Sequence, residues 1–307
     1  MTGPRATRRV VAFGAASWNT MLRVAAFPPP EPASIYPTGW HETIGSSGAG
    51  KAMNLARLGV DVTLHCLLGE DEAGARVRAG LEAAGVTVSA VPDRKGTARH
   101  VNLMDPGGRR MSFLFQTSDA DARFDDATVE RLVSSADEVL VAISDPTRPV
   151  LGIARRLGKR TWTDLHSTDG QRAWERDFWT ADRVFFSGER LPDPRPFMEE
   201  LRAAGRELIV CTRAEAGAIA LTADGRWLNV AAESVTEIVD TNGAGDAFLA
   251  AMVFAELQDL PTEAALVVAA RVAALAVQFP DLAPAAVDLD ALQAGLPAAD
   301  ASPATAT

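Results

Sequence analysis

Cysteine is scarce in this chain of 307 residues, with only Cys66 and Cys211 present. Each lies inside an apolar run, and the sequence contains no metal-ligand spacing. These absences argue against a disulfide framework and against a structural metal site. No uninterrupted apolar run reaches membrane-spanning length, and residues 1–9 have no apolar signal core. We therefore expect a cytoplasmic protein without a membrane partner.

Positive charge is also in short supply. Lysine occurs only at Lys51, Lys95 and Lys159, the formal net charge is −10, and the pI is about 5.0. Nucleic acid as the main partner is disfavoured, because phosphate backbones attract basic surfaces. The 47% hydrophobic and 23% charged residues are an ordinary globular profile. This length suits one large α/β domain or two smaller ones.

Repeated strand–helix units follow residue 128. Predicted strands there are Glu138–Ile143, Arg160–Thr163, Arg183–Phe186 and Glu207–Thr212, after earlier ones at Val10–Gly14 and Val60–Leu68. Such alternation is typical of a parallel sheet with helices on both faces. Ligands of such sheets bind beyond the carboxyl ends of the strands. We expect the loops that hold Asn19, Asp164, Ser187, Thr212 and residues 240–246 to converge there, although Asp164 alone could equally cap its strand.

A second, smaller sheet is predicted from two segments. Apolar runs at 101–104 and 111–114 flank Asp-Pro-Gly-Gly, which is a hairpin signature. We expect residues 33–44 and 97–115 to form a lid on a domain that spans residues 1–296. Residues 297–307 are rich in Pro, Ala, Ser and Thr and are predicted to be disordered.

The most informative motif is residues 240–248, DTNGAGDAF. Its glycines let backbone N–H groups turn outward, and the helix predicted over Asp246–Leu257 adds its positive N-terminal end. Asp246 stands at the mouth of this anion pocket. An anion pocket beside a carboxylate suits phosphoryl transfer to an alcohol, because the carboxylate can take the hydroxyl proton.

This motif resembles the C-terminal signature of the ribokinase-like (PfkB) carbohydrate kinases, Asp-Thr-x-Gly-Ala-Gly-Asp-x-Phe. The order of elements agrees over roughly residues 9–285. The resemblance implies a doubly wound, mostly parallel α/β fold with a small β lid. It implies transfer of the γ-phosphoryl group of ATP, with Mg²⁺, to a hydroxyl of a sugar or sugar-like compound. It also implies a homodimer that forms through the lid.

Site residues follow from the resemblance. Asp246 would be the general base, and the amides of Gly243, Ala244 and Gly245 would form an anion hole. Asp240 and Thr241 would order that loop and are candidates to hold a monovalent cation such as K⁺.

On the acceptor side the resemblance covers the first strand and the glycine loop that precedes the helix at 52–58. Asn19 stands where the family has Asp, Ser46 replaces a glycine, and Gly50 replaces an asparagine. The implied substrate-binding residues are Asn19, Gly45, Ser46, Ser47, Gly50 and Asp246.

On the nucleotide side the family's Asn-x-x-Glu and Thr-x-Gly-x-x-Gly elements are altered. Ser187 replaces the asparagine, and Glu189 is a candidate contact of Mg²⁺, which would be held mainly through ATP and water. The implied ATP-binding residues are Ser187, Thr212, Arg213, Ala214, Gly217, Gly243, Gly245, Ala269 and Ala273.

Three alternatives stay open. The acceptor could be a nucleoside, and the altered motifs could belong to a member that binds a ligand without catalysis. Residues 45–51, GSSGAGK, nearly match a P-loop, but the Ser or Thr that should follow Lys51 is missing. A P-loop would leave the motif at 240–248 unexplained.

Overall fold

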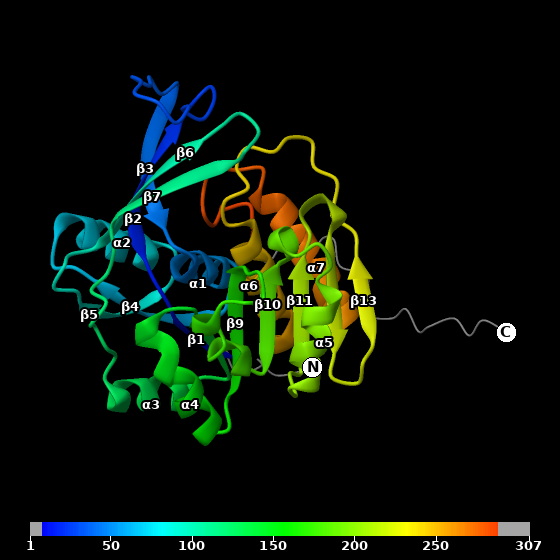
Figure 1. Cartoon of the computed structure of the whole chain (residues 1–307). Helices are drawn as coiled ribbons and strands as arrows, with labels where there is room; N and C mark the ends of the chain where they lie inside the picture. Colours follow the sequence, from blue (N-terminus) through cyan, green and yellow to red (C-terminus); the bar gives the residue numbers. More distant parts are fainter. Residues whose placement is uncertain (1–7, 288–307) are drawn as a thin grey trace, which may run out of the picture.

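The computed structural model describes residues 8–287, and its main body is a nine-stranded sheet of order β13-β12-β11-β10-β9-β8-β1-β4-β5 (Figure 1). All neighbours from β5 to β11 pair in parallel, whereas β12 runs antiparallel to both β11 and β13. The strands are β1 (Arg9–Phe13), β4 (Asp61–Leu68), β5 (Thr87–Pro92), β8 (Glu138–Ala142), β9 (Arg160–Ser167), β10 (Arg183–Ser187), β11 (Leu208–Thr212), β12 (Ala218–Thr222) and β13 (Trp227–Val230). The predicted doubly wound, mostly parallel fold is confirmed.

Helices cover both faces of this sheet because successive residues of each strand point to opposite sides. Val10 and Ala12 of β1 pack into one apolar cluster with α1, α2, α6 and α7. Val11 and Phe13 pack into a second cluster with α3, α4 and α5. The helices are α1 (Ser47–Arg57), α2 (Glu72–Ala83), α3 (Asp126–Ser135), α4 (Arg148–Arg156), α5 (Arg195–Ala203), α6 (Ala244–Leu257) and α7 (Thr262–Ala276).

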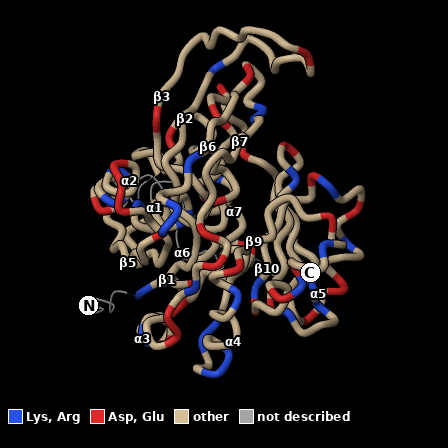
Figure 2. The backbone as a smooth tube through the Cα atoms, turned by 60° about the vertical axis from the view of Figure 1, so that its left-hand side comes forward, with Lys and Arg blue, Asp and Glu red and all other residues tan. Residues whose placement is uncertain are grey.

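A four-stranded lid rises beside the body, in the order β3-β2-β6-β7 (Figure 1). Its strands are β2 (Ser17–Arg23), β3 (Gly39–Gly45), β6 (Ala98–Met104) and β7 (Arg110–Gln116). The smaller sheet was predicted, but β2 was not. Asn19 therefore lies inside a lid strand, and the prediction that it follows a strand in a loop is wrong. Between β2 and β3, residues 24–38 carry one charged side chain, Glu31 (Figure 2).

Two helices begin earlier than predicted. Residues 45–50 were expected to form a loop, yet α1 begins at Ser47, so Ser47 and Gly50 lie in its first turn. Helix α6 begins at Ala244 rather than at Asp246, which places Asp246 within the first turn. Strands β5, β12 and β13 were not predicted from the sequence. The tail predicted at 297–307 lies outside the described residues.

Cys66 and Cys211 are both free and buried, as expected for a chain without a disulfide framework. Over residues 8–287, none of the helices combines the length and the apolar composition needed to cross a bilayer.

Candidate active site

The carboxyl ends of β8, β9, β10 and β11 form one edge of the sheet, and polar side chains gather along it. Asp164 of β9 pairs in register with Ala142 of β8 and Phe185 of β10. Two residues beyond Phe185 on β10, Ser187 is in register with both Ser167 of β9 and Thr212 of β11. Helices α1 and α6 contribute Lys51 and Asp246, both near their N-terminal ends, to the same region.

The loop before α6 is organised by its first carboxylate. Asp240 is buried, and its Oδ1 accepts a hydrogen bond from the amide of Asn242 at 2.7 Å. Burial raises the pKa of the Asp240 carboxyl, and nearby Arg110 opposes that shift. Gly243 caps α6 with φ of 87°, a left-handed conformation that favours glycine.

This conformation leaves backbone donors available at the start of α6. The amides of Gly243 and Gly245 have no hydrogen-bond acceptor within residues 8–287, while that of Ala244 has a long contact of 3.4 Å to the carbonyl of Thr241. Two free N–H groups at a helix N-terminus make a site suited to an anionic oxygen. Asp246 lies beside them in the first turn of the same helix.

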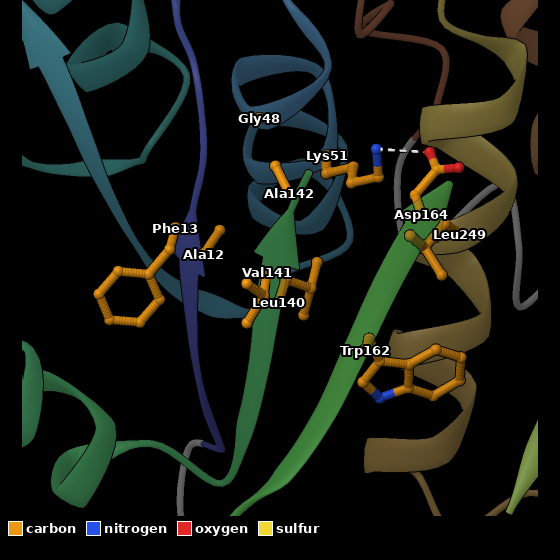
Figure 3. A pocket seen from close by; sticks show the side chains of 10 residues that line it. All are labelled: Ala12, Phe13, Gly48, Lys51, Leu140, Val141, Ala142, Trp162, Asp164 and Leu249. Atoms are coloured by element: carbon orange, nitrogen blue, oxygen red, sulfur yellow. Dashed lines mark ion pairs between the residues drawn. The ribbon is translucent and has the colours of Figure 1, made fainter. Parts of the chain in front are cut away.

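Lys51 joins two carboxylates, those of Asp164 and Asp246, at the centre of the site. Figure 3 shows its ion pair with Asp164. Its Nζ lies 2.8 Å from Asp164 Oδ2 and 2.7 Å from Asp246 Oδ1, and it also donates to the hydroxyl of Ser47. The exposed fractions of the three charged side chains are only 6% for Lys51, 5% for Asp164 and 11% for Asp246. Burial opposes the charged form of Lys51, but Asp164 and Asp246 outweigh it and raise the pKa of the amine to about 12.

His166 completes the surroundings of Asp164. Its Nδ1 lies 3.3 Å from Asp164 Oδ2, and its backbone amide donates to Asp164 Oδ1 at 2.8 Å. A φ of 54° turns His166 back toward the carboxylate, where β9 loses register with β10. Burial would raise the pKa of Asp164, but His166 and Lys51 together hold it below the usual range. In return, Asp164 raises the pKa of His166.

The predicted acceptor residues lie together where β2 and β3 meet α1. Asn19 is buried, and its Oδ1 accepts a hydrogen bond from the hydroxyl of Ser17, which is also 2.8 Å from that of Ser46. A Cβ at Gly45 would lie 1.9 Å from Asn19 Nδ2, so only glycine leaves room for this side chain. Ser47 donates to Asp246 Oδ1 at 2.5 Å, which joins this cluster to the candidate base.

The predicted nucleotide residues lie along β10, β11 and α7. Ser187 ends β10, and Thr212 ends β11. Residues 213–217 form a turn closed by the amide of Arg213, which donates to the carbonyl of Gly217 at 2.7 Å. Ala214 and Gly217 in that turn both have positive φ. Ala269 is fully buried in α7, whereas Ala273 is partly exposed.

Glu189 lies at the same edge as these residues. It is exposed, and its carboxylate accepts a hydrogen bond from the hydroxyl of Ser167 at 2.9 Å. No group of three or more His, Cys, Asp or Glu side chains within residues 8–287 could by itself hold a metal ion.

The tip of the β6–β7 hairpin reaches the loop before α6. Thr241 Oγ1 donates to the carbonyl of Gly108 at 2.8 Å, and the guanidinium of Arg110 donates to Asn242 Oδ1. The lid thus contacts the same short loop that presents the free amides.

Known proteins match nearly all of this chain. It matches the pfkB family carbohydrate kinases over residues 7–150 and 191–286. The chain belongs to this family. It is 33% identical over 291 residues to acarbose 7(IV)-phosphotransferase of Actinoplanes sp., covering 92% of this chain and 96% of that protein. It is 29% identical over 269 residues to an ATP-dependent ribose-1-phosphate kinase of Halopiger xanaduensis, covering 84% and 88% of the two chains.

Solved structures of carbohydrate kinases share the fold of this chain. A microbiome-derived acarbose kinase, Mak1, superposes with a TM-score of 0.86 at 27% identity, covering 94% of this chain and 99% of that one. A ribokinase of Arabidopsis thaliana complexed with ribose and ATP shares the fold, with a TM-score of 0.79 at 19% identity and coverage of 94% and 98%. This pfkB family kinase is accordingly an ATP-dependent enzyme that phosphorylates a hydroxyl of a sugar or sugar-like substrate.

The contacts of Lys51 in this kinase do not suit a P-loop. A P-loop lysine reaches toward phosphates, whereas Lys51 is buried and bonded to Ser47, Asp164 and Asp246. The amides of Ala49 and Gly50 are used as well, by the carbonyls of Ala15 and Ser46.

From the sequence, Lys51 was considered only as the lysine of the P-loop alternative, His166 had no role in the site, and Asp164 was left undecided. The only local signal was the spacing of Ser47 and Lys51, which are four residues apart and therefore share one face of a helix. That signal was hidden because residues 45–50 were interpreted as a loop.

Proposed function

We propose that Asp246 is the general base of this sugar kinase. Three observations support it: the carboxylate lies in the first turn of α6, two free amides lie beside it, and the predicted acceptor residues reach it through Ser47. The free amides next to a carboxylate carry the proposal, because one feature suits an anionic phosphoryl group and the other an alcohol proton.

The transfer follows from these positions. The acceptor O–H bond breaks as its proton passes to Asp246, and the acceptor oxygen forms a new bond to the γ-phosphorus. The bond from that phosphorus to the β,γ-bridging oxygen breaks, and its electron pair leaves with ADP. The amides of Gly243, Ala244 and Gly245 stabilise negative charge on the transferring group. Exclusion of water by the lid limits wasteful hydrolysis of ATP.

The nucleotide is proposed to bind along Ser187, Thr212 and the turn at 213–217, with α7 next to its adenine ring. Mg²⁺ neutralises phosphate charge when bound. The donors present suit it, because Mg²⁺ prefers oxygen ligands and is commonly held by one or two carboxylates with phosphates and water. Glu189 is the carboxylate proposed for that role. Asp240, buried beside Thr241, is the candidate neighbour of K⁺.

Acarbose is the acceptor that we propose to test first. The relative that is 33% identical is named for phosphorylating it, and Mak1 has the same named substrate. Ribose 1-phosphate is the second choice because of the Halopiger relative. We place the reaction in the cytoplasm, where ATP is supplied.

A dimer through the lid is also proposed. Its strands and the preceding loop expose large apolar side chains, namely Ile35, Tyr36, Trp40, Met111, Phe113, Leu114 and Phe115. Exposed apolar side chains on the edge strands β3 and β7 call for a cover, and a second copy of the lid supplies one of matching character.

The test is ADP release and product mass with ATP, Mg²⁺ and each of acarbose, ribose 1-phosphate, ribose and adenosine, with and without K⁺. Asp246→Asn should lower kcat by at least about a hundredfold, the scale of a lost general base. Asp224→Asn is the matched control, because that carboxylate is exposed in the turn between β12 and β13. Near-normal turnover by Asp246→Asn would refute the assignment. Phosphorylation of adenosine alone would favour a nucleoside kinase, and ATP binding without transfer would favour a non-catalytic member.

A further inference from the structure

The buried ammonium of Lys51 has all of its hydrogens engaged. A lysine carries three N–H donors and no acceptor. Three acceptors surround Nζ, namely the hydroxyl of Ser47 and the carboxylates of Asp164 and Asp246. No donor is left to reach an ATP phosphate, and a side chain that is 6% exposed has little access to one. Lys51 therefore acts on its two carboxylate neighbours.

The two oxygens of Asp246 differ in what surrounds them. Oδ1 accepts from Ser47 Oγ at 2.5 Å and from Lys51 Nζ at 2.7 Å. Oδ2 has no donor within residues 8–287. The space beside Oδ2 is open only because residue 50 is glycine, since a Cβ there would lie 2.6 Å from that oxygen.

We propose that Lys51 and Ser47 are positioning residues that fix Asp246 through Oδ1 and leave Oδ2, facing Gly50, to receive the acceptor proton. The proposal rests on the role of Asp246 as general base. Lys51 is in turn held by Asp164 on the neighbouring strand end, so the orientation of the base is anchored to β9 as well as to α1.

This arrangement suits the reaction. A carboxylate that is held by two donors on one oxygen cannot rotate freely, so its other oxygen keeps one direction toward the incoming hydroxyl. Misplacement of a reacting group by about 1 Å can cost on the order of a hundredfold in rate.

The test uses Lys51→Met, Lys51→Ala and Ser47→Ala in the full chain, with acarbose or whichever acceptor of the panel above is phosphorylated. Lys51→Met should lower kcat by at least about tenfold and leave KM for ATP within about twofold, because the nucleotide contacts stay intact. Methylammonium or ethylammonium should restore part of the kcat of Lys51→Ala. Lys95→Met is the control, since that lysine is exposed and its Nζ is 3.6 Å from Asp119.

Ser47→Ala decides the matter if the Lys51 variants do not fold, because it removes one donor to Oδ1 and leaves the ion pairs in place. It should lower kcat severalfold without changing KM for ATP. A kcat within twofold of wild type for Lys51→Met, or for Ser47→Ala where only that variant folds, overturns the inference. A kcat of Lys51→Ala that neither methylammonium nor ethylammonium raises also overturns it. If Asp246→Asn is inactive while Lys51→Met is normal, only this inference fails; an active Asp246→Asn removes the proposed function itself.

Discussion

Replacing Asp164 by asparagine should destabilise the fold far more than the same replacement of an exposed aspartate would. Asp164 is 5% exposed, and its Oδ2 is 2.8 Å from Lys51 Nζ. Asparagine can still accept the hydrogen bond from the His166 amide, so the change removes mainly the charge. Removing one partner of a buried ion pair costs about 3–5 kcal/mol. We expect about 3 kcal/mol, because Asp246 remains to pair with Lys51.

That loss corresponds to a decrease in Tm of roughly 6 °C for a chain of this size. Thermal and urea unfolding followed by circular dichroism measure it. Asp169→Asn is the matched control, because Asp169 is 43% exposed and lies 3.9 Å from its partner Arg172. Such a pair contributes about 1 kcal/mol or less. If Asp164→Asn loses no more stability than this control, the argument that the buried charges hold one another is wrong.

Asp164 and its neighbour His166 give the stability of the fold a pH dependence of known sign. The depressed pKa of Asp164 stabilises the fold above pH about 4, its unfolded value, and that contribution is lost as the pH falls below it. The raised pKa of His166 stabilises the fold below pH about 6.5, and that contribution is lost as the pH rises through the folded value. Asp164→Asn should reduce the loss of unfolding free energy that the wild-type protein shows as the pH rises above about 6.5.

Two further predictions concern the lid. Gly45→Ala must displace Asn19, so KM for the acceptor should rise by about tenfold or more with little change in KM for ATP; steady-state kinetics with an unchanged acceptor KM would contradict the position given to Asn19. Wild-type protein should run as a dimer in size-exclusion chromatography with light scattering, and Phe113→Glu as a monomer, because Phe113 is 50% exposed on the edge strand β7. A monodisperse wild-type monomer at micromolar concentration would exclude the lid dimer.

Local patterns were enough to predict the parallel core and the turn before α6. The strands β8, β10 and β11 are short, mainly apolar runs, and the glycines at 243 and 245 stand between two carboxylates in a short motif. Strand β2 was missed because its buried residues include the polar Ser17 and Asn19. These two side chains are hydrogen-bonded to each other, and Asn19 fits against Gly45, so the strand does not show the apolar pattern of a core strand.

Helix α1 shows why the centre of the site could not be predicted. Its glycines suggested a loop. A Cβ at Gly48 would lie 2.6 Å from the carbonyl oxygen of Ala15, so this glycine lets the helix pack closely against the backbone at Ala15. The partners of Lys51 are carboxylates on β9 and α6, which are distant in the chain. No spacing rule identifies such a contact, because only the folded sheet brings the three elements together.

The hydrogen bonds from Thr241 to Gly108 and from Arg110 to Asn242 fasten the lid hairpin to the loop ahead of α6. It follows that swinging the lid outward deprives this loop of two anchors at once. An outward movement of the lid would therefore release the phosphorylated product and loosen the loop that presents the free amides in one event.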